Sequence, residues 1–562
     1  MASSDSDESV HSCINVAVLP EDLSEACTAD CTPERCDNAT VRPHEPPLVE
    51  RGLPGQFQPF EVPRREPEVR GLPETPLDLF QRYLPHEMAK CWADWSNGAK
   101  NREGPLLQHS RAHAWVPTSA EEIYLFVGIL LYMGIHPESK ISQYWSSSQE
   151  NEDPIYPFTR FITRDRFQLL LRRIRIFNTT LFDEDPPNDR SRQQRYQPPE
   201  NQMPKVYRQV NQWSTHIQEI GDSFFQPGSH LTVDEAMVRF TGRSLETTTI
   251  PSKPTPVGYK VWVLAQSGYF LRWLWHVHGK GPYGLVPQQR ARRQGNAEGT
   301  LEHLTPTQRV VTTLITLLPV AIYHVFLDNL FASVKLFRAL RSKEIGATGT
   351  CRKDCGIDEI LVAEKEGEGK GIPWGEIHAI PTKDGQINQM TWKDNALVLF
   401  LTTVYRETEE VLRNRRRPAG SSAAHRAARE VFGPDDRKQL PIPLGIDEYN
   451  HNMNGVDTGD QMRSYSQYRR PIRRGGWQAI AFNFLLEVVV VNSFLLQLWG
   501  ESNWPTVKSQ WQWRRLLATE LIQHYGPLVT ARQRSRPQRA TDKRNDAIPW
   551  RQHNRISKQP SS

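Results

Sequence analysis

Short apolar segments between residues 230 and 343 most constrain what this chain can fold into. The first, Leu231–Phe240, has the composition of a β-strand. Two more, 260–266 and 269–278, flank Ser267-Gly268, a dipeptide typical of the turn in a β-hairpin. The sequence therefore predicts three strands, the last two of which form an antiparallel pair.

The residues after this hairpin predict a helical crossover to another strand. A helix over 305–318 opens with capping-box residues and ends at Pro319. A short buried strand over 321–327 and a second helix over 330–343 follow. Because a helical crossover makes the new strand parallel to a neighbour, we expect an α/β layer with mixed pairing.

Other patterns surround this layer. We expect helices over 123–135, 164–176 and 206–225 before it, and over 477–499 and 511–525 after it. Residues 350–442 favour a smaller β-rich segment whose strongest strand is 392–404, with a flexible basic loop over 413–429. The apolar runs 310–327 and 478–499 are interrupted by Pro319 or by polar residues, so we expect buried elements rather than membrane spans.

Charge is distributed unevenly along the chain. Residues 1–50 hold 11 Asp and Glu against 2 Arg, a net charge of −9, while the whole chain is at +5. The remaining residues therefore carry +14, since 5 + 9 = 14. A basic body suggests a polyanion as partner, most simply nucleic acid. The acidic arm has a plain alternative function as a solubilising tail.

Cysteines predict neither disulfides nor a zinc site. The acidic first residues lack the apolar core of a secretory signal, so we expect reduced thiols in the cytosol or nucleus. Cys27, Cys31 and Cys36 are close in sequence, but no second pair provides zinc-ligand spacing. No Cys follows Cys355.

Four aspartates occupy settings suited to metal chemistry. Asp234 and Asp328 lie in or after the predicted strands, and Asp457 and Asp460 share a polar turn before a helix. Carboxylates at strand ends and a helix start can bind two hard cations about 4 Å apart, as enzymes that cut and join phosphodiesters do. The alternative is that Asp328, Asp457 and Asp460 cap the helices that follow them.

Several motifs give these aspartates a common context. They are Val233-Asp-Glu-Ala-Met-Val-Arg-Phe-Thr-Gly-Arg with Lys253-Pro and Gly258-Tyr-Lys, Leu327-Asp-Asn-Leu-Phe-Ala-Ser with Gly346-Ala-Thr-Gly-Thr-Cys-Arg, Trp392-Lys-Asp, and Tyr449-Asn with Gly455-Val-Asp-Thr-Gly-Asp-Gln-Met and Arg473-Arg-Gly-Gly-Trp477. In this order and spacing, across residues 75–525, the sequence resembles the piggyBac-type transposases. Any one block is a weak match, whereas the set is specific.

The resemblance implies a ribonuclease-H-like catalytic core with a β-rich insertion domain, flanked by a helical dimerisation and DNA-binding region. It also implies cleavage at TTAA sites, hairpin intermediates at the transposon ends and reinsertion at TTAA. The family's catalytic and metal-binding carboxylates correspond to Asp234, Asp328, Asp457 and Asp460, which would hold two Mg²⁺ or Mn²⁺ ions. A nuclear homodimer acting on double-stranded DNA follows, with no membrane or small-molecule substrate.

These expectations divide the chain into seven parts. They are a disordered acidic arm (1–72), a helical region (73–228), the catalytic core (229–349), the insertion domain (350–444), the rest of the core (445–466), the rest of the helical region (467–525) and a disordered basic tail (526–562).

Basic residues near these motifs are the candidates for DNA contacts. The resemblance and the charge pattern point to Arg243, Lys253, Lys260, Arg352, Arg469, Arg470, Arg473, Arg474 and Trp477. Arginine can bind phosphates and Trp477 can stack on a splayed base. Alternatively, the charges solvate a surface and Trp477 packs in the core.

Two functions remain open at this stage. Many family members end in a Cys/His-rich zinc module that reads transposon ends, which we do not expect here because no Cys follows Cys355. A basic tail could bind DNA but not read its sequence comparably. The intact set of four aspartates favours a transposase, and the missing module favours a domesticated DNA-binding or chromatin protein.

Overall fold

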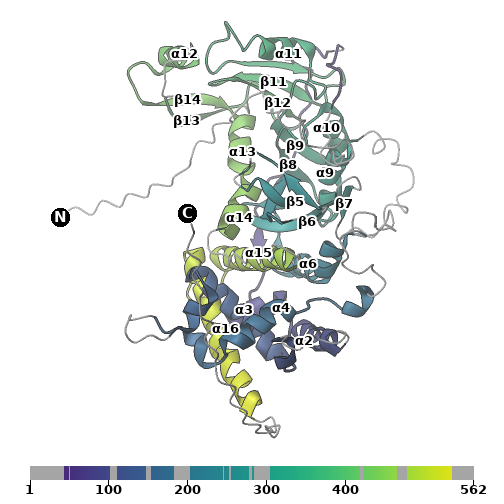
Figure 1. Ribbon diagram of the computed structural model, residues 1–562. Coiled ribbons are helices and arrows are strands. Elements are labelled where there is room, and N and C mark those ends of the chain that lie inside the picture. The colour runs from purple at the N-terminus through teal and green to yellow at the C-terminus, as the bar shows by residue number, and fades with distance from the viewer. Residues whose placement is uncertain are drawn as a thin grey trace, which may run out of the picture.

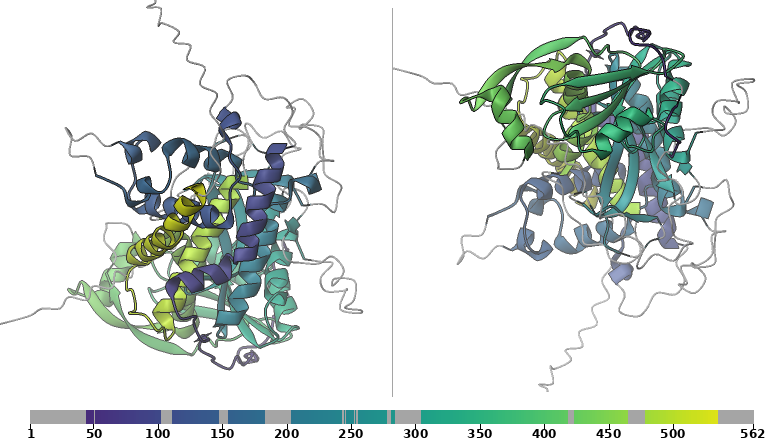
Figure 2. Two further views of the ribbon diagram at one scale, coloured as in Figure 1. Left: turned by 90° about the horizontal axis from the view of Figure 1, so that it is seen from below. Right: turned by 90° about the horizontal axis from the view of Figure 1, so that it is seen from above.

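The structure is a computed structural model that describes residues 44–49, 51–101, 111–146, 154–182, 203–242, 244, 246–251, 253, 255–277, 281–283, 304–417, 423–464 and 478–534. Figure 1 shows an elongated molecule in which a β-rich end and a helical end lie on opposite sides of a central sheet. Figure 2 shows the same body from below and from above.

One mixed sheet of ten strands forms the centre. Its order is β10-β11-β12-β9-β8-β3-β5-β6-β7, with β4 paired to β5. The strands are β3 (His230–Arg239), β4 (Thr247–Thr249), β5 (Val257–Gln266), β6 (Tyr269–Val277), β7 (Gly281–Tyr283), β8 (Tyr323–Leu327), β9 (Ile345–Thr350), β10 (Ile377–Pro381), β11 (Asn388–Lys393) and β12 (Leu397–Thr402). Only β8 is parallel to its neighbours, β3 and β9, and all other pairs are antiparallel. The predicted α/β layer with mixed pairing is confirmed.

The predicted hairpin and crossover are both present. Ser267 and Gly268 have positive φ angles of 49° and 95°, as the tight turn between β5 and β6 requires. Helix α9 (Pro306–Thr316) is closed by the expected capping box between Thr305 and Gln308. Helix α10 (Val334–Arg341) begins at the cap residue Ser333 and completes the β8–β9 connection. Local sequence signals therefore determine this part of the fold.

Helices cover the opposite end of the molecule. They are α1 (Pro76–Tyr83), α2 (His86–Asn101), α3 (Ala120–Ile135), α4 (Arg164–Arg173), α6 (Lys205–Phe224), α15 (Gln478–Trp499) and α16 (Gln510–Arg534), with 3-10 turns η4 (Arg111–Ala114), η5 (Ile141–Trp145), η7 (Pro157–Arg160) and η8 (Thr179–Phe182). Helices α3 and α16 approach closely at Gly128, where a Cβ would lie 2.8 Å from Leu521 Cβ. Because α16 runs to Arg534, the first nine residues of the expected disordered tail are helical instead.

Helix α15 lies between the sheet and the other helices (Figure 1). Within the described residues, its segment Ala479–Trp499 is long and apolar enough to cross a membrane by length and composition. However, 89% of its apolar window is buried inside the protein. Its composition is therefore that of a core helix, as the sequence predicted.

The segment 44–72 corrects the expectation of a disordered arm over 1–72. This N-terminal strap, described except for residue 50, runs along the body in extended conformation. Arg51 binds Asp358, Phe60 N donates to Thr403 O, and β1 (Glu68–Val69) pairs with β2 (Phe225–Gln226). The strap has no periodic pattern because it takes its order from distant partners. Residues 1–43 lie outside the described part of the chain.

The expected boundary at residue 350 falls inside the sheet. Strand β12 pairs with β9, with Phe400 opposite Thr350, so β10–β12 continue the central sheet rather than forming a separate one. The strand expected over 392–404 is part of a hairpin, because β11 ends at Lys393 and β12 begins at Leu397. The two-stranded sheet of β13 (Glu410–Arg416) and β14 (Arg437–Pro443) stands apart. Helices α11 (Glu359–Glu366), α12 (Ala423–Phe432), α13 (Leu444–Asn452) and α14 (Gly455–Ser464) complete the fold.

A buried ion pair joins α15 to α16 and provides a test of the helical end. Arg514 is fully buried and donates to both oxygens of Glu487, which is itself buried. Replacing Glu487 with Ala would leave a buried charge unpaired. We expect Glu487→Ala to lower the free energy of unfolding by about 3–5 kcal/mol, measured by chemical denaturation. The exposed Glu501→Ala should change it by less than about 0.5 kcal/mol, and equal effects would contradict this account.

Candidate catalytic site

Two of the predicted aspartates lie side by side on neighbouring parallel strands. Val233 on β3 is opposite Leu327 on β8, so Asp234 and Asp328 occupy the next positions of strands that lie about 4.8 Å apart. Asp234 is only 5% exposed. The hairpin and crossover that the sequence predicts are therefore what bring these two carboxylates together.

Helix α14 brings the third aspartate to the same end of β3. A Cβ on Gly455 would lie 3.1 Å from Thr232 Oγ1, so the helix begins directly against β3, two residues from Asp234. Gly459 lies against the β5–β6 turn, where a Cβ would be 2.5 Å from Gly268 O. The absence of a side chain at Gly459 permits this close approach of α14 to the turn. Asp457, between these glycines, is exposed on one side.

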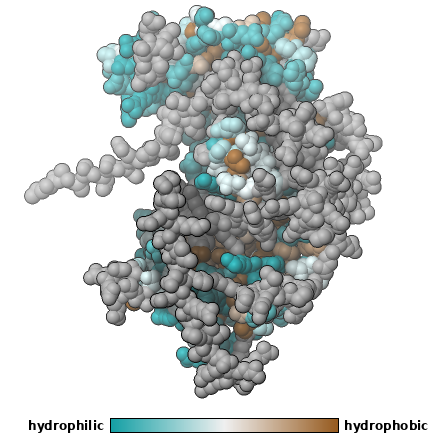
Figure 3. All heavy atoms as spheres, in the orientation of Figure 1, coloured by the Kyte–Doolittle hydropathy of each residue, from teal (hydrophilic) through white to brown (hydrophobic). Residues whose placement is uncertain are grey.

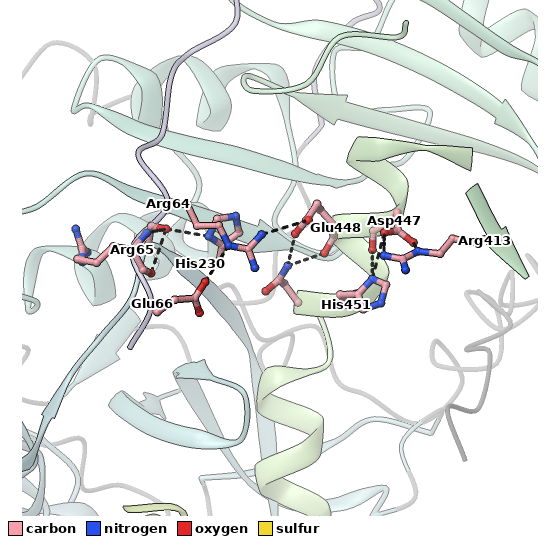
Figure 4. A network of polar contacts seen from close by, with 10 residues as sticks. Arg64, Arg65, Glu66, His230, Arg413, Asp447, Glu448 and His451 are labelled. Carbon is pink, nitrogen blue, oxygen red and sulfur yellow. Dashed lines mark hydrogen bonds and ion pairs between the residues drawn. The ribbon is translucent and has the colours of Figure 1, made fainter. Parts of the chain in front are cut away.

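A network of polar contacts fixes α13, the helix that precedes α14 (Figure 4). From the strap, Arg64 lies 3.9 Å from a Glu448 oxygen. On the other side, Arg413 of β13 donates two hydrogen bonds to Asp447, and His451 Nδ1 lies 2.7 Å from Asp447 O. Thr232 on β3 donates to Asn452 O at the end of α13. These contacts hold the segment that carries Asp457.

The three carboxylates crowd one another electrostatically. Burial and the nearby Glu235, Asp328 and Asp457 raise the pKa of Asp234 well above its usual value. Burial and Glu235 raise the pKa of Asp328 to about 7. Burial and Asp460 raise the pKa of Asp457. The site therefore holds more negative charge than its surroundings neutralise.

Lys253 is the cation in this cluster. Its Nζ lies 3.9 Å from Asp234 Oδ2 and 3.6 Å from Glu235 Oε1. Burial lowers the pKa of Lys253, but Asp234, Glu235, Asp457 and Asp328 together outweigh burial and raise it. Lys253, expected as a DNA contact, is here the counter-charge of the acidic cluster.

Glu235 is a site residue that the sequence reasoning missed. It is buried, its Oε2 accepts no hydrogen bond within the described residues, and Lys260 and Lys253 lower its pKa despite burial. The Lys260 Nζ lies 4.0 Å from the Trp262 ring centroid and the side chain is 2% exposed, so Lys260 is not on a DNA-accessible surface here. The signal available in the sequence was the position of Glu235 directly after Asp234.

The Asp460 carboxylate forms hydrogen bonds within its own helix, α14. Its Oδ1 accepts hydrogen bonds from Arg463 Nε at 3.0 Å and Nη2 at 2.5 Å. Arg463 Nη2 also donates to Met237 O on β3 at 2.9 Å. Asp460 therefore helps to hold α14 against β3, and its role as a metal ligand stays a prediction.

Asp328 does not cap the helix that follows it, as one alternative expected, but closes the turn after β8. Asp328 Oδ1 accepts from Leu330 N at 2.9 Å, whereas α10 is capped by Ser333. Arg352 donates to Asn329 O and Oδ1, and its charge lowers the pKa of Asp328 against the effect of burial. Arg352 thus lies beside the acidic cluster, and its contact with DNA stays a prediction. Arg243, Arg469, Arg470, Arg473, Arg474 and Trp477 lie outside the described residues.

The donor chemistry fits a hard divalent cation. Carboxylate oxygens are the ligands that Mg²⁺ and Mn²⁺ prefer. Burial is the main cause of the raised pKa values of Asp234, Asp328 and Asp457, and a bound cation would favour the charged form of each. Within the described part of the chain, no three His, Cys, Asp or Glu side chains are grouped so as to hold an ion as they stand. The carboxylates that would hold an ion lie around Lys253, which is itself a cation and not a metal ligand.

Comparison with known proteins identifies the class first. A protein-family model described as Transposase IS4 matches residues 75–494, more than half of the chain. The match places the chain in a class of transposase-like proteins. The chain is a member of this transposase family, of the piggyBac type.

Two individual proteins are similar to this chain. The human PiggyBac transposable element-derived protein 2 is 21% identical over 396 residues, which cover 70% of this chain and 58% of that protein. This chain thus spans less than two thirds of that relative's length. A cryo-EM structure of a piggyBac transposase synaptic complex with hairpin DNA has a TM-score of 0.57 and 19% identity, covering 85% of this chain and 86% of that one. This likeness shows a shared fold.

The raised pKa of Asp328 predicts a pH-dependent stability. The pKa of Asp328 in the folded protein, about 7, exceeds its usual value of 3.8. The contribution of the Asp328 carboxyl to stability is therefore fully present below about pH 4 and is lost as the pH rises through about 7. Asp328→Asn keeps the acceptor oxygen without the charge. We expect it to stabilise the metal-free protein by at least about 1 kcal/mol at pH 8, and by less at pH 5.

Urea unfolding in EDTA at the two pH values measures this difference. The exposed Asp94→Asn serves as control and should change stability little at either pH. A stabilisation by Asp328→Asn that is equal at pH 5 and pH 8 would show that the Asp328 carboxyl does not titrate as described.

Proposed function

We propose that this chain is a metal-dependent DNA transposase of the piggyBac type that cuts and rejoins DNA at TTAA sites. The observation that carries the proposal is that three aspartates from separate parts of the sequence surround one lysine. The Lys253 ammonium lies 3.9 Å from Asp234, and Asp234, Asp328 and Asp457 all raise its pKa. Family membership supports the reaction class. The solved relative was captured with hairpin DNA, which supports DNA as the substrate here.

A ribonuclease-H-like core is part of this proposal. The five strands β6-β5-β3-β8-β9 combine an antiparallel hairpin with a parallel pair reached through α9. Asp234 lies on the central strand of this order, and Asp328 follows the next strand. This arrangement supports the proposed core, with the helical end as the dimerisation and DNA-binding region.

The residues of the chain have separable tasks in this mechanism. Asp234, Asp328 and Asp457, with Asp460 nearby, would hold two Mg²⁺ or Mn²⁺ ions. When bound, such ions activate the attacking oxygen and stabilise the leaving oxygen of an in-line displacement. Burial and Glu235 disfavour the charged form of Asp328, and a bound cation would favour it. Arg352 fixes the turn that carries Asp328, and burial of Asp234 limits access of water.

Nuclear location and action as a homodimer are further parts of the proposal, supported by the basic runs of the sequence and by the family. The alternative is a domesticated DNA-binding or chromatin protein without strand transfer. Lys253 favours that alternative in one respect, because its ammonium already neutralises part of the acidic cluster. The two functions predict different chemistry on the same DNA.

Isosteric substitutions test the assignment of the carboxylates. We expect Asp234→Asn, Asp328→Asn and Asp457→Asn each to reduce Mg²⁺-dependent DNA cleavage by more than about 100-fold. Loss of a residue that merely orients a metal ligand already costs up to about 100-fold, and these three residues are the proposed ligands themselves. Binding to the same DNA in EDTA should remain. Asp460→Asn should cost less because Asp460 is held by Arg463. Retained cleavage by any of the first three variants would reject that residue's assignment.

A cellular excision assay distinguishes the two functions. The reporter carries the DNA that flanks this gene, and wild type is compared with Asp328→Asn at equal expression. Excision by wild type alone supports a working transposase. Absence of excision by both proteins, when each is folded and bound to DNA, would support the domesticated binder.

A further inference from the structure

The two-stranded sheet β13–β14, called the ribbon below, stands apart from the central sheet at the β-rich end of the molecule (Figure 1). Its seven cross-strand pairs run from Glu410 opposite Pro443 to Arg416 opposite Arg437. Side chains alternate between two faces along each strand. The sequence suggested a flexible basic loop over 413–429, but residues 413–416 belong to a strand.

The inner face of the ribbon is fully used by the fold. Leu440 is buried against Trp374 and Phe432, and Ile442 is buried against a neighbouring apolar cluster. Arg413 is bound to Asp447 by two hydrogen bonds of 2.8 and 2.6 Å, and Arg415 lies 2.9 Å from Asp394. Asp447 and Asp394 thus neutralise Arg413 and Arg415, and Lys438 of the same face donates a hydrogen bond to Val431 O, so this face is anchored to the fold.

The outer face has no such role. Its exposed residues are Glu410, Leu412, Asn414 and Arg416 of β13 and Arg437, Gln439 and Pro441 of β14. Arg416 and Arg437 lie directly opposite each other, and neither has an acidic partner within the described residues. Like charges directly opposite on a sheet destabilise it. Figure 3 shows a hydrophilic surface at this end of the molecule.

The chemistry of this face matches one partner in particular. Arginine, Asn and Gln are the side chains that bind phosphates and the edges of guanine and adenine, and an exposed Leu can contact a thymine methyl group. A two-stranded ribbon of seven residues is about 23 Å long, and the major groove of B-form DNA admits such a ribbon. Glu410 lies at one end of this face and the Arg416–Arg437 pair at the other. At the arginine end, charge and shape therefore both favour double-stranded DNA.

We propose that the outer face of the ribbon binds duplex DNA in the major groove, a step that rests on the proposed action on DNA. Arg416 and Arg437 contact phosphates or guanines, and Asn414 and Gln439 contact base edges. The inner face links this contact to the acidic site, because Arg413 binds Asp447 on α13, which leads directly into α14 (Figure 4). The ribbon would thus provide a sequence-reading element within residues 350–444, the expected insertion domain.

Fluorescence anisotropy of the full chain with a 30-base-pair duplex in EDTA tests the proposal without cleavage. We expect Arg416→Ala/Arg437→Ala to weaken binding at least tenfold and to reduce the slope of log affinity against log salt by about 2. Arg309→Ala/Lys370→Ala, which removes the same charge from exposed positions outside the ribbon and outside the helical end, should stay within about twofold of wild type. Arg416→Lys/Arg437→Lys should retain most of the salt-dependent binding.

A second variant tests sequence reading. Asn414→Ala/Gln439→Ala should leave affinity for a scrambled duplex unchanged and reduce the preference for the gene's own flanking DNA. Equal preference in this variant and in wild type would overturn base reading by the ribbon.

The outcomes separate this proposal from the proposed function. Wild type that binds DNA, with ribbon and control variants behaving alike, would overturn the ribbon proposal and leave the transposase proposal intact. Wild type that does not bind duplex DNA would overturn both, and a ribbon-dependent preference for RNA would overturn the choice of DNA. The melting temperature of Arg416→Ala/Arg437→Ala should equal or exceed that of wild type, because repulsion is relieved; a clear fall would show a structural role and overturn the premise.

Discussion

Two like charges on adjacent parallel strands are the constraint around which this protein is organised. Asp234 and Asp328 follow residues that are opposite in register, so the pairing of β3 with β8 forces their carboxylates together. Burying such a pair disfavours ionisation, as the raised pKa values of both residues indicate. The strands β3 and β8 thus combine deep burial with unfavourable electrostatics.

The neighbouring elements moderate this cost. Lys253 approaches Asp234 and Glu235, and Lys260 lowers the pKa of Glu235 from within the sheet. Helix α14 adds a third carboxylate, Asp457, but it is also held to β3 through Arg463 and Met237 O. The cluster of carboxylates therefore lowers the stability of the protein and is not needed to form the fold, as is typical of functional sites.

Local sequence signals were sufficient to predict the central strands and helices, but not the residues that contact them from distant parts of the chain. The turn at Ser267-Gly268, the capping box at Thr305 and the strand before Asp328 are encoded by neighbouring residues, and all three are present. Glu235 was missed because alternation along a strand does not reveal which lysines approach from elsewhere. The strap was mistaken for disorder for the same reason: Arg51 pairs with a residue more than 300 positions away. Side-chain partners across such distances leave no periodic trace in sequence.

The strap also has a consequence for how the chain is made. Its partners Asp358, Thr382 and Thr403 lie far towards the C-terminus, so residues 51–60 leave the ribosome long before their binding sites exist. Closing such a long loop is entropically costly, and contacts of this kind form late. The strap can therefore bind its partners at the β-rich end only after most of the protein has been synthesised.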